Sequence, residues 1–562
     1  MKVWSYFTLA IVFSSSLLAA ETPAARKPNI IFILADDLGY SDLGCYGSEI
    51  ETPNLDALAA NGLRFTQFYN TARCWPSRAA LMTGYYAQQV NRDPQGPRPK
   101  WAALLPQLLK ESGYKSYHSG KWHIDGKILD AGFSRSYHTT DHDRFFSPKH
   151  HQLDDQPLPP PAAGERYYAT TATAQRALQW LSEHESDHKE QPFFLYLAFI
   201  APHFPLQALP EDIEKYKDRY QAGWDEIRAK RWARMQQMGL VAGDLSDPEP
   251  MTAPSWNLSE QELQKRIGPG ESGLAVPWNE LTADQRFFQA QKMAIHAAMI
   301  DRMDREIGRV FEKLRAMNAW DDTLIFFASD NGASAEQIIR GDGHTIGSAP
   351  GSAQSYLGLG PGWSTVSNTP FRRHKSWNHE GGVSTPLIAH WPRRIQPRGT
   401  LVNDPGHLVD IAPTIFEIAN VTPPTKWNEE SRPTLPGRSL VSFLDLTDPS
   451  KPALKEVSRP NPGELRVPGV FPSRPHFGLP LEKQKPIFFK HIENRGLRVN
   501  NWKIVASGKN APWELYDLTE DRAESKNLAV EYPGTVEELV KIWNALDAEY
   551  AQQGATGKPA AQ

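Results

Sequence analysis

The sequence predicts an α/β protein built around a large sheet whose central strands are covered on both faces. Residues 29–34, 192–199 and 323–328 are continuous apolar runs rich in β-branched and aromatic side chains, which is typical of strands buried on both sides. The segments between them carry apolar residues at helical spacing. With 562 residues and a mass of 63.1 kDa, the chain exceeds one ordinary domain and can bury a large core.

Acidic and amide side chains follow two of these strands. Residues 29–34 lead into Asp36 and Asp37, and residues 323–328 lead into Asp330 and Asn331. Open α/β sheets bind ligands beyond the carboxyl ends of their strands, and Ca²⁺ and Mg²⁺ prefer oxygen ligands. The pattern therefore predicts a site for a hard divalent cation, although an Asp-Asp pair alone is also typical of a helix cap or a solvated turn.

Helical spacing is clearest in three segments. One helix is expected to start within residues 52–58, a second near residue 104, and a third covers residues 289–314. The third places Met293, Ile300 and Ile307 on one face, a stripe that indicates core packing. Residues 210–285 are rich in Trp, Arg and Pro and are expected to form a lid or a wall of a binding site.

One of the two cysteines lies in the motif Cys-Trp-Pro-Ser-Arg at residues 74–78, which opens a segment of helical character ending at Gly84. Cys74 is therefore expected at or just before a helix N-terminus, where backbone N–H groups favour an anion. Arg78 adds a planar set of donors suited to an oxyanion. For the motif taken alone, a buried and inert cysteine is the alternative. Cys45 is expected to be a small buried residue, not a disulfide partner.

Four further basic side chains of interest lie in predicted loops. Lys121 and His123 belong to the sequence Gly-Lys-Trp-His, His203 lies between two prolines, and Lys375 lies five residues before Glu380. Stiff backbone around His203 suits a positioned acid but equally suits a packed corner. Alone, lysines and histidines in loops are usually solvated.

Together these motifs resemble those of the formylglycine-dependent, or type I, sulfatases. The similarity rests on Cys-x-Pro-Ser-Arg followed by Leu-x-Thr-Gly, on Ala-Asp-Asp-Leu-Gly at 35–39, on Ser-Asp-Asn-Gly at 329–332 and on Gly-Lys-Trp-His at 120–123. Gly-Asp-Gly-His at 341–344 and His-Glu-Gly-Gly at 379–382 resemble the arylsulfatase subgroup in particular. The resemblance implies an alkaline-phosphatase-like fold, with a mixed sheet sandwiched by helices and a smaller C-terminal α+β subdomain of an antiparallel sheet plus a helix.

The resemblance also implies a role for each candidate residue in the hydrolysis of a sulfate ester. A formylglycine-generating enzyme oxidises Cys74 to Cα-formylglycine, whose hydrate is the nucleophile. A divalent cation, Ca²⁺ or alternatively Mg²⁺, is held by Asp36, Asp37, Asp330, Asn331 and the modified Cys74. Arg78, Lys121 and Lys375 neutralise the sulfate oxygens. His203 protonates the leaving oxygen, and His123 takes the proton of the remaining hydroxyl so that sulfate is expelled.

The chain divides into four expected regions. Residues 1–20 carry a lysine, an apolar run and two small residues, the layout of a secretory signal peptide, so the protein is expected to be exported and to be periplasmic or secreted. A sulfatase catalytic domain over 28–421, a proline-rich connection over 422–485 and a C-terminal subdomain over 486–553 follow. In the last region, short strand patterns precede a helix that is expected to begin near Val536, capped by Thr535.

Charge and hydropathy argue against two classes of partner. A net charge of −4 and a pI near 6.5 give no basic footprint for nucleic acid, and no segment after the first 20 residues is apolar enough to suggest a membrane partner. The predicted partner is a sulfated small molecule or a sulfated carbohydrate. Two other functions stay open: a phosphoesterase or phosphonate hydrolase of the same superfamily, and a non-catalytic protein that binds sulfated glycans and keeps Cys74 as a thiol.

Overall fold

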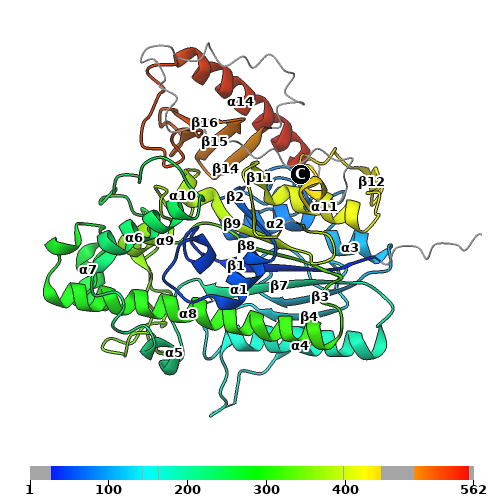
Figure 1. The fold of residues 1–562 in the computed structure, drawn as a ribbon, viewed down its shortest axis with the longest axis horizontal. Helices are drawn as coiled ribbons and strands as arrows, with labels where there is room; N and C mark the ends of the chain where they lie inside the picture. Colours follow the sequence, from blue (N-terminus) through cyan, green and yellow to red (C-terminus); the bar gives the residue numbers. More distant parts are fainter. Residues whose placement is uncertain (1–26, 142, 163, 397, 445–485, 556–562) are drawn as a thin grey trace, which may run out of the picture.

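A computed structural model describes residues 27–141, 143–162, 164–396, 398–444 and 486–555. Within them, eleven strands form one mixed sheet in the order β10-β2-β9-β8-β1-β7-β3-β4-β5-β6, with β11 paired to β2 (Figure 1). Strand β1 is parallel to its neighbours β7 and β8, whereas β9 is antiparallel to β8 and β2, so the predicted mixed α/β sheet is confirmed. The strands are β1 (Asn29–Asp36), β2 (Leu63–Tyr69), β3 (Lys115–Gly120), β4 (Arg135–Thr139), β5 (His151–Leu153), β6 (Gln156–Leu158), β7 (Phe193–Pro202), β8 (Thr323–Ser329), β9 (Ser384–His390), β10 (Thr400–Val402) and β11 (Gly406–His407).

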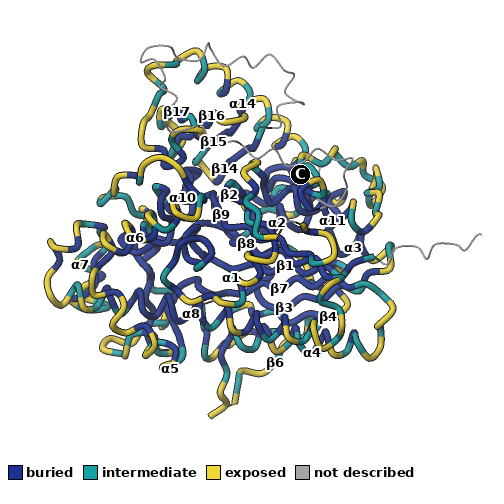
Figure 2. Tube along the Cα trace, viewed as in Figure 1, coloured by how far each residue is buried: buried dark blue, intermediate teal, exposed yellow. Residues whose placement is uncertain are grey.

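Successive residues of the central strand β1 contact different helix layers. Ile31 belongs to the apolar cluster on one face of the sheet, and Phe32 belongs to the cluster on the other. Figure 2 shows the sheet as buried interior between these layers. Because both faces are covered, the strand is continuously apolar and not alternating. The first layer contains α1 (Pro53–Ala60), α4 (Ala169–Asp187) and α8 (Ala283–Ala316), and the second contains α2 (Cys74–Thr83), α3 (Leu105–Lys110) and α11 (Ile411–Ile418).

Helix α8 carries the predicted core stripe along its 34 residues. Met293, Ile300 and Ile307 are fully buried, and the helix packs along α4 and β7. Thr282 and Gln285 form a capping box at its N-terminus, which satisfies backbone donors that have no partner inside the helix. The expected lid region before α8 folds into α5 (Pro210–Glu214), α6 (Gly223–Gln237), α7 (Glu260–Arg266) and η2 (Trp278–Glu280).

The C-terminal region forms the predicted antiparallel sheet with one helix packed on it (Figure 1). The predicted helix start near Val536 is wrong, because the N–H of Val536 already donates to the carbonyl of Tyr532 and the helix begins at Pro533. Proline suits the first helical position, where its missing N–H costs nothing. The elements are β14 (Ile487–His491), β15 (Asn494–Val499), β16 (Trp502–Ala506), β17 (Glu514–Asp517) and α14 (Pro533–Ala555).

The described part of the expected connection, residues 422–444, contains regular elements as well as loops. They are β12 (Lys426–Trp427), β13 (Glu430–Ser431) and α12 (Val441–Leu444). The expected signal peptide and residues 445–485 lie outside the described residues. None of the helices that the structure describes combines the length and apolar character needed to cross a membrane. The remaining short helices are η1 (Gly44–Tyr46), α9 (Gly360–Ser367), α10 (Glu380–Val383) and η3 (Leu408–Asp410).

Candidate active site

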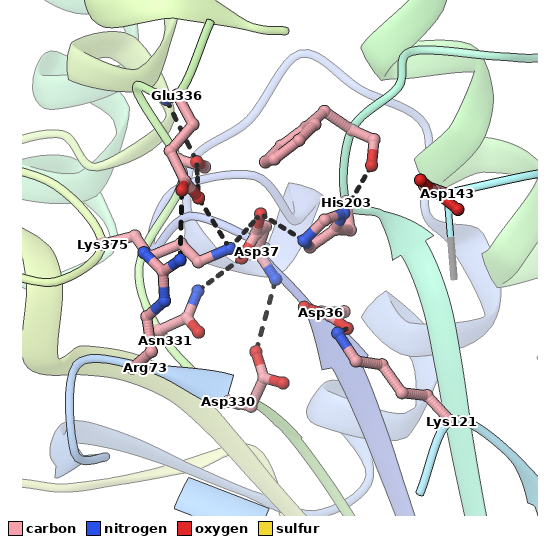
Figure 3. A network of polar contacts seen from close by, with 12 residues as sticks. Asp36, Asp37, Arg73, Lys121, Asp143, His203, Asp330, Asn331, Glu336 and Lys375 are labelled. Carbon is pink, nitrogen blue, oxygen red and sulfur yellow. Dashed lines mark hydrogen bonds and ion pairs between the residues drawn. The ribbon is translucent and has the colours of Figure 1, made fainter. Parts of the chain in front are cut away.

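The carboxyl ends of β1 and β8 bring four oxygen-bearing side chains together. The two strands pair in parallel, so the residues that follow them lie side by side. Asp37 has a φ of 64°, and its N–H lies 3.4 Å from Oδ1 of Asp330. Asn331 Nδ2 donates to Oδ1 of Asp37 at 2.7 Å (Figure 3). With Asp36 at the end of β1, the four predicted cation ligands therefore occupy one site.

Cys74 is the first residue of α2 and lies beside this cluster. Its Sγ and one carboxylate oxygen from each of Asp36 and Asp330 lie within 4.8 Å of one another. Ser77 of the same motif fixes the preceding turn, because its Oγ accepts from the N–H of Thr71 at 3.0 Å. Burial raises the pKa of the Cys74 thiol, so the unmodified side chain is a neutral and weak nucleophile.

Two buried lysines each pair with one of the β1 carboxylates. Lys121 Nζ lies 2.5 Å from Oδ2 of Asp36, and Lys375 Nζ lies 2.8 Å from Oδ1 of Asp37. Both ammonium groups come from loops far apart in the sequence, and both side chains are at most 2% exposed. The structure therefore brings both predicted lysines to the predicted cation ligands.

Arg78 lies one helical turn after Cys74 and directs its guanidinium at the same carboxylates. Its Nη2 is 2.7 Å from Asp330 and 3.1 Å from Asp36, and its Nη1 donates to the carbonyl of Lys121 at 2.9 Å. The side chain is fully buried. These contacts order the carboxylates, and the expected contact of Arg78 with sulfate oxygens stays a prediction.

The two predicted histidines reach the site from different loops. His203 follows β7, is 2% exposed and places Nε2 3.7 Å from Oδ2 of Asp37, while its Nδ1 donates to the carbonyl of Phe204. His123 has a φ of 58° and packs edge-on against Trp75, with 5.8 Å between ring centroids. His203 therefore lies at the cation ligands, and His123 lies beside the residue that follows Cys74.

The buried carboxyl groups of the site respond differently to their surroundings. Burial alone would raise the pKa of Asp36, but Lys121 and Arg78 hold that pKa below its usual value. Burial raises the pKa of Asp37, which Lys375 only partly offsets. Burial and the neighbouring Asp36 raise the pKa of Asp330 to about 7. Burial thus disfavours the charged forms of Asp37 and Asp330 by more than the neighbouring cationic groups favour them.

The donor set fits a hard divalent cation. Oδ1 of Asp36 and Oδ1 of Asn331 are buried and have no hydrogen-bond partner within the part of the chain that the structure describes. Leaving such oxygens without a partner is costly. Carboxylate and amide oxygens are what Ca²⁺ and Mg²⁺ bind. A cation among these side chains would satisfy both oxygens and favour the charged forms of Asp37 and Asp330.

The sequence patterns did not indicate one further buried carboxylate, Glu336. It is 2% exposed and lies 3.1 Å from Nζ of Lys375 and 3.1 Å from Nη2 of Arg73. Its position five residues after Asn331, in the loop leaving a buried strand, was the signal that could have found it. Arg73, the N-cap of α2, was missed as well.

Comparisons with known proteins agree with this geometry. A family model described as Sulfatase matches residues 28–421. An uncharacterized sulfatase of Schizosaccharomyces pombe is 30% identical over 579 residues, which cover 93% of this chain and 94% of that protein. An arylsulfatase of Klebsiella aerogenes is 30% identical over 462 residues, which cover 73% of this chain and 90% of that protein.

Solved structures show a similar fold. Ps i-CgsB has a TM-score of 0.62 with 23% sequence identity and covers 94% of both chains. The same protein has been solved in complex with k-i-k-neocarrahexaose. At this level of identity the similarity establishes a shared fold across nearly the whole chain.

Proposed function

The chain belongs to the sulfatase family and hydrolyses sulfate esters, and we propose that it does so with Cα-formylglycine made from Cys74 beside a bound Ca²⁺. The observation that carries this proposal is the position of Cys74: its Sγ and one carboxylate oxygen from each of Asp36 and Asp330 lie within 4.8 Å of one another. A cysteine thiol alone gives no reason for two carboxylates to lie beside it. A modified side chain with an oxygen that shares a cation with these carboxylates gives one.

Asp36, Asp37, Asp330 and Asn331 would hold the cation, with an oxygen of the modified residue 74 completing the set. When bound, the cation neutralises sulfate oxygens and so lowers the barrier for attack at sulfur. Ca²⁺ suits a site of several carboxylate and amide oxygens, and Mg²⁺ is the alternative for the same donors.

The chain's own side chains bind the substrate and move protons. Lys121 and Lys375 bind the sulfate oxygens through their ammonium groups. Arg78 holds the carboxylates of the cation site in place. His203 is assigned to protonate the leaving oxygen through Nε2, because its Nδ1 is held by a carbonyl. His123 is assigned to take a proton at residue 74, which its place beside Trp75 supports.

The substrate that we infer is a sulfated carbohydrate or another sulfated small molecule. The rings of Trp75 and Trp256 both lie near Arg73, with centroids 5.3 and 5.6 Å from its guanidinium carbon, and Trp256 is 47% exposed. Aromatic walls with a few polar groups are typical of sites for organic ligands. The oligosaccharide bound to Ps i-CgsB favours the carbohydrate. Nucleic acid and membranes are not proposed as partners.

Export and maturation complete the proposal. The layout of residues 1–20 supports secretion to the periplasm or the medium. A formylglycine-generating enzyme would have to reach Cys74 before folding is complete, because the folded chain leaves that residue 3% exposed.

The test combines peptide mass spectrometry with rates on three ester classes. Protein made with a formylglycine-generating enzyme should yield a residue-74 peptide lighter than its thiol form, and it should react with a carbonyl probe. Activity on nitrophenyl sulfate should rise with the aldehyde fraction and exceed activity on the matching phosphate monoester and diester. Full activity in protein that holds only unmodified Cys74 would contradict the proposed nucleophile.

A further inference from the structure

Lys375 has two carboxylate partners, and only one of them belongs to the cation site. Its Nζ lies 2.8 Å from Oδ1 of Asp37 and 3.1 Å from Oε2 of Glu336 (Figure 3). In the cation-bound enzyme proposed above, Asp37 gives its oxygens to a doubly charged ion that also repels the ammonium group. Glu336 is then the carboxylate left to hold Lys375.

Glu336 is itself held by donors on both oxygens. Oε1 accepts from Arg73 Nη2 at 3.1 Å and from Trp256 Nε1 at 2.9 Å, and Oε2 accepts from Ser334 Oγ at 3.2 Å. Burial alone would raise the pKa of Glu336, but Lys375 and Arg73 outweigh it and hold that pKa well below its usual range. The carboxylate is therefore ionised and fixed in place.

The backbone on both sides of Glu336 is clamped by the lid region. Asn257 Nδ2 donates to the carbonyl of Ala335 at 2.9 Å, and its Oδ1 accepts from the N–H of Gln337 at 2.9 Å. The N–H of Leu258 donates to the carbonyl of Gln337 at 3.0 Å. The segment that carries Trp256 thus fixes the chain at Glu336 as well as its side chain.

The charge balance of the buried cluster also depends on Glu336. Four buried carboxylates face four cationic groups, so the formal charges cancel without a cation. A divalent cation would leave the cluster with two positive charges, which suits a singly charged sulfate ester. Without Glu336, Lys375 and Arg73 would lie in low-dielectric surroundings with one compensating charge fewer, which is strongly unfavourable. The carboxylates are Asp36, Asp37, Asp330 and Glu336, and the cations are Arg73, Arg78, Lys121 and Lys375.

We propose that Glu336 is a positioning residue that aims Lys375 at the sulfate oxygens, and that Trp256 and Arg73 hold Glu336 for this purpose. The inference rests on the proposed function, because it takes Lys375 as a sulfate-binding group. In this arrangement Glu336 connects the lid region, through Trp256, to the sulfate-binding Lys375.

A double-mutant cycle tests whether Glu336 acts through Lys375. Lys375→Ala should lower kcat/KM on nitrophenyl sulfate by about 10²- to 10³-fold. Glu336→Gln should lower it by roughly 10- to 100-fold in the wild type and have almost no effect in the Lys375→Ala background. Binding of inorganic sulfate to the Ca²⁺-loaded protein, measured by calorimetry, should weaken in both single variants and no further in the double variant.

The control is Glu249→Gln. Glu249 pairs with Arg372 and Arg373, in the same loop as Lys375, and forms no ion pair with Lys375 among the described residues. We expect this variant to keep kcat/KM within about threefold of wild type, because the partly buried ion pairs of Glu249 do not involve the sulfate-binding groups. Additive losses for Glu336→Gln and Lys375→Ala, or an equal loss for Glu249→Gln, would overturn the inference. A wild-type rate for Lys375→Ala alone would instead count against the proposed sulfate-binding role of Lys375.

Trp256→Phe keeps the test decisive if Glu336→Gln does not fold. Trp256 is 47% exposed, so the change removes one N–H donor to Glu336 with little effect on the core. A loss of several-fold in kcat/KM that disappears in the Lys375→Ala background supports the inference. A loss that persists unchanged in that background contradicts it.

Discussion

Asp330 is a carboxylate of the site whose charged form is disfavoured in the folded protein. Its pKa is raised to about 7 by burial and by Asp36, although Arg78 lies 2.7 Å away. A bound divalent cation would favour the charged form. Asp330→Asn keeps the shape of the side chain and removes its charge, so it separates the electrostatic role from the packing role.

We expect Asp330→Asn to lower turnover by about 10²-fold or more, because the cation loses a charged ligand and the sulfate loses its main electrostatic anchor. Thermal unfolding during a Ca²⁺ titration provides a second readout. The midpoint of the wild type should rise with Ca²⁺ and return on chelation, whereas that of the variant should stay nearly constant. A near-wild-type rate at saturating Ca²⁺ would show that the cation lies elsewhere.

His203 leads to a prediction that depends on the leaving group. If its Nε2 protonates the departing oxygen, losing it should matter most for leaving groups that are poor without a proton. His203→Ala should therefore cost about 10²- to 10⁴-fold on a carbohydrate sulfate and much less on nitrophenyl sulfate, whose phenolate leaves readily. Steady-state rates on aryl sulfates of graded phenol pKa measure this. Equal losses across the series would exclude the assigned role.

Single residues were predictable where a motif and a strand end coincided. Asp36 and Asp330 follow continuous apolar runs, so their place at the edge of the sheet could be expected from the pattern alone. For Glu336 the local signal was only its position after Asn331, and its role did not follow from that, because it lies in an irregular loop and owes its position to Trp256 and Arg73, which come from distant segments. Its partners are set by tertiary contacts that leave no local periodicity.

Among the elements, β16 of the C-terminal sheet reaches back to the active site through buried charges. Lys503 Nζ lies 2.8 Å from Glu380, the first residue of α10, and 2.8 Å from Glu524. The glycines after Glu380 pack on the loop of Asn331: a Cβ on Gly332 would lie 1.8 Å from the carbonyl oxygen of Gly381. The C-terminal sheet thus supports the loop that carries two predicted cation ligands.

Lys503→Met should lower the free energy of unfolding by about 3–5 kcal/mol, because it leaves two buried carboxylates short of a positive charge. Lys490→Met is the matched control in the same sheet. Its partner is Asp547, and both side chains are about a quarter exposed, so its loss should cost roughly 0–1 kcal/mol. Chemical denaturation of the two variants gives the comparison. Equal losses in the free energy of unfolding would show that the buried charges of Lys503 stabilise the fold no more than the partly exposed pair of Lys490 does.

Elements were predictable in proportion to how completely they are buried. The runs that became β1, β7 and β8 are apolar throughout because helices cover both faces. Strands of two or three residues, such as β10 and β11, were not indicated, because their extended form is defined by hydrogen bonds to β2 and not by their own side chains. The early start of α14 was missed because Thr535 offered a competing cap signal.

Across the described part of the molecule, burial holds at least five histidines in the neutral form. Burial lowers the pKa of His138, His374 and His390 to about 4 and that of His407 to about 3, and it places the pKa of His118 well below the ordinary value. In the unfolded chain each would titrate near 6.5. Between about pH 6.5 and 4 the unfolded chain therefore binds up to five more protons at these positions than the folded chain does.

Several carboxyl groups work in the opposite direction. The pKa of Asp304 is raised to about 6 and that of Asp330 to about 7, and burial also raises those of Asp37 and Asp56, so the folded chain binds protons that the unfolded chain binds only near pH 4. The five histidines, together with carboxyl groups such as Asp42 and Glu514, whose pKa is lowered to about 2, outweigh these groups. The free energy of unfolding should thus fall as the pH falls through this window.

Each proton of difference contributes about 1.4 kcal/mol per pH unit, so the slope should be at least about 1.4 kcal/mol per unit near pH 5. Denaturant titrations at pH 7, 6 and 5 measure it. His390→Gln removes one of these histidines and should reduce the slope by roughly one proton, whereas Asp304→Asn removes an opposing group and should increase it by a similar amount. Added Ca²⁺ should act as Asp304→Asn does, because a cation on Asp330 prevents its protonation. A slope of opposite sign, or one that neither variant changes, would contradict the assignment of these buried groups as the source of acid sensitivity.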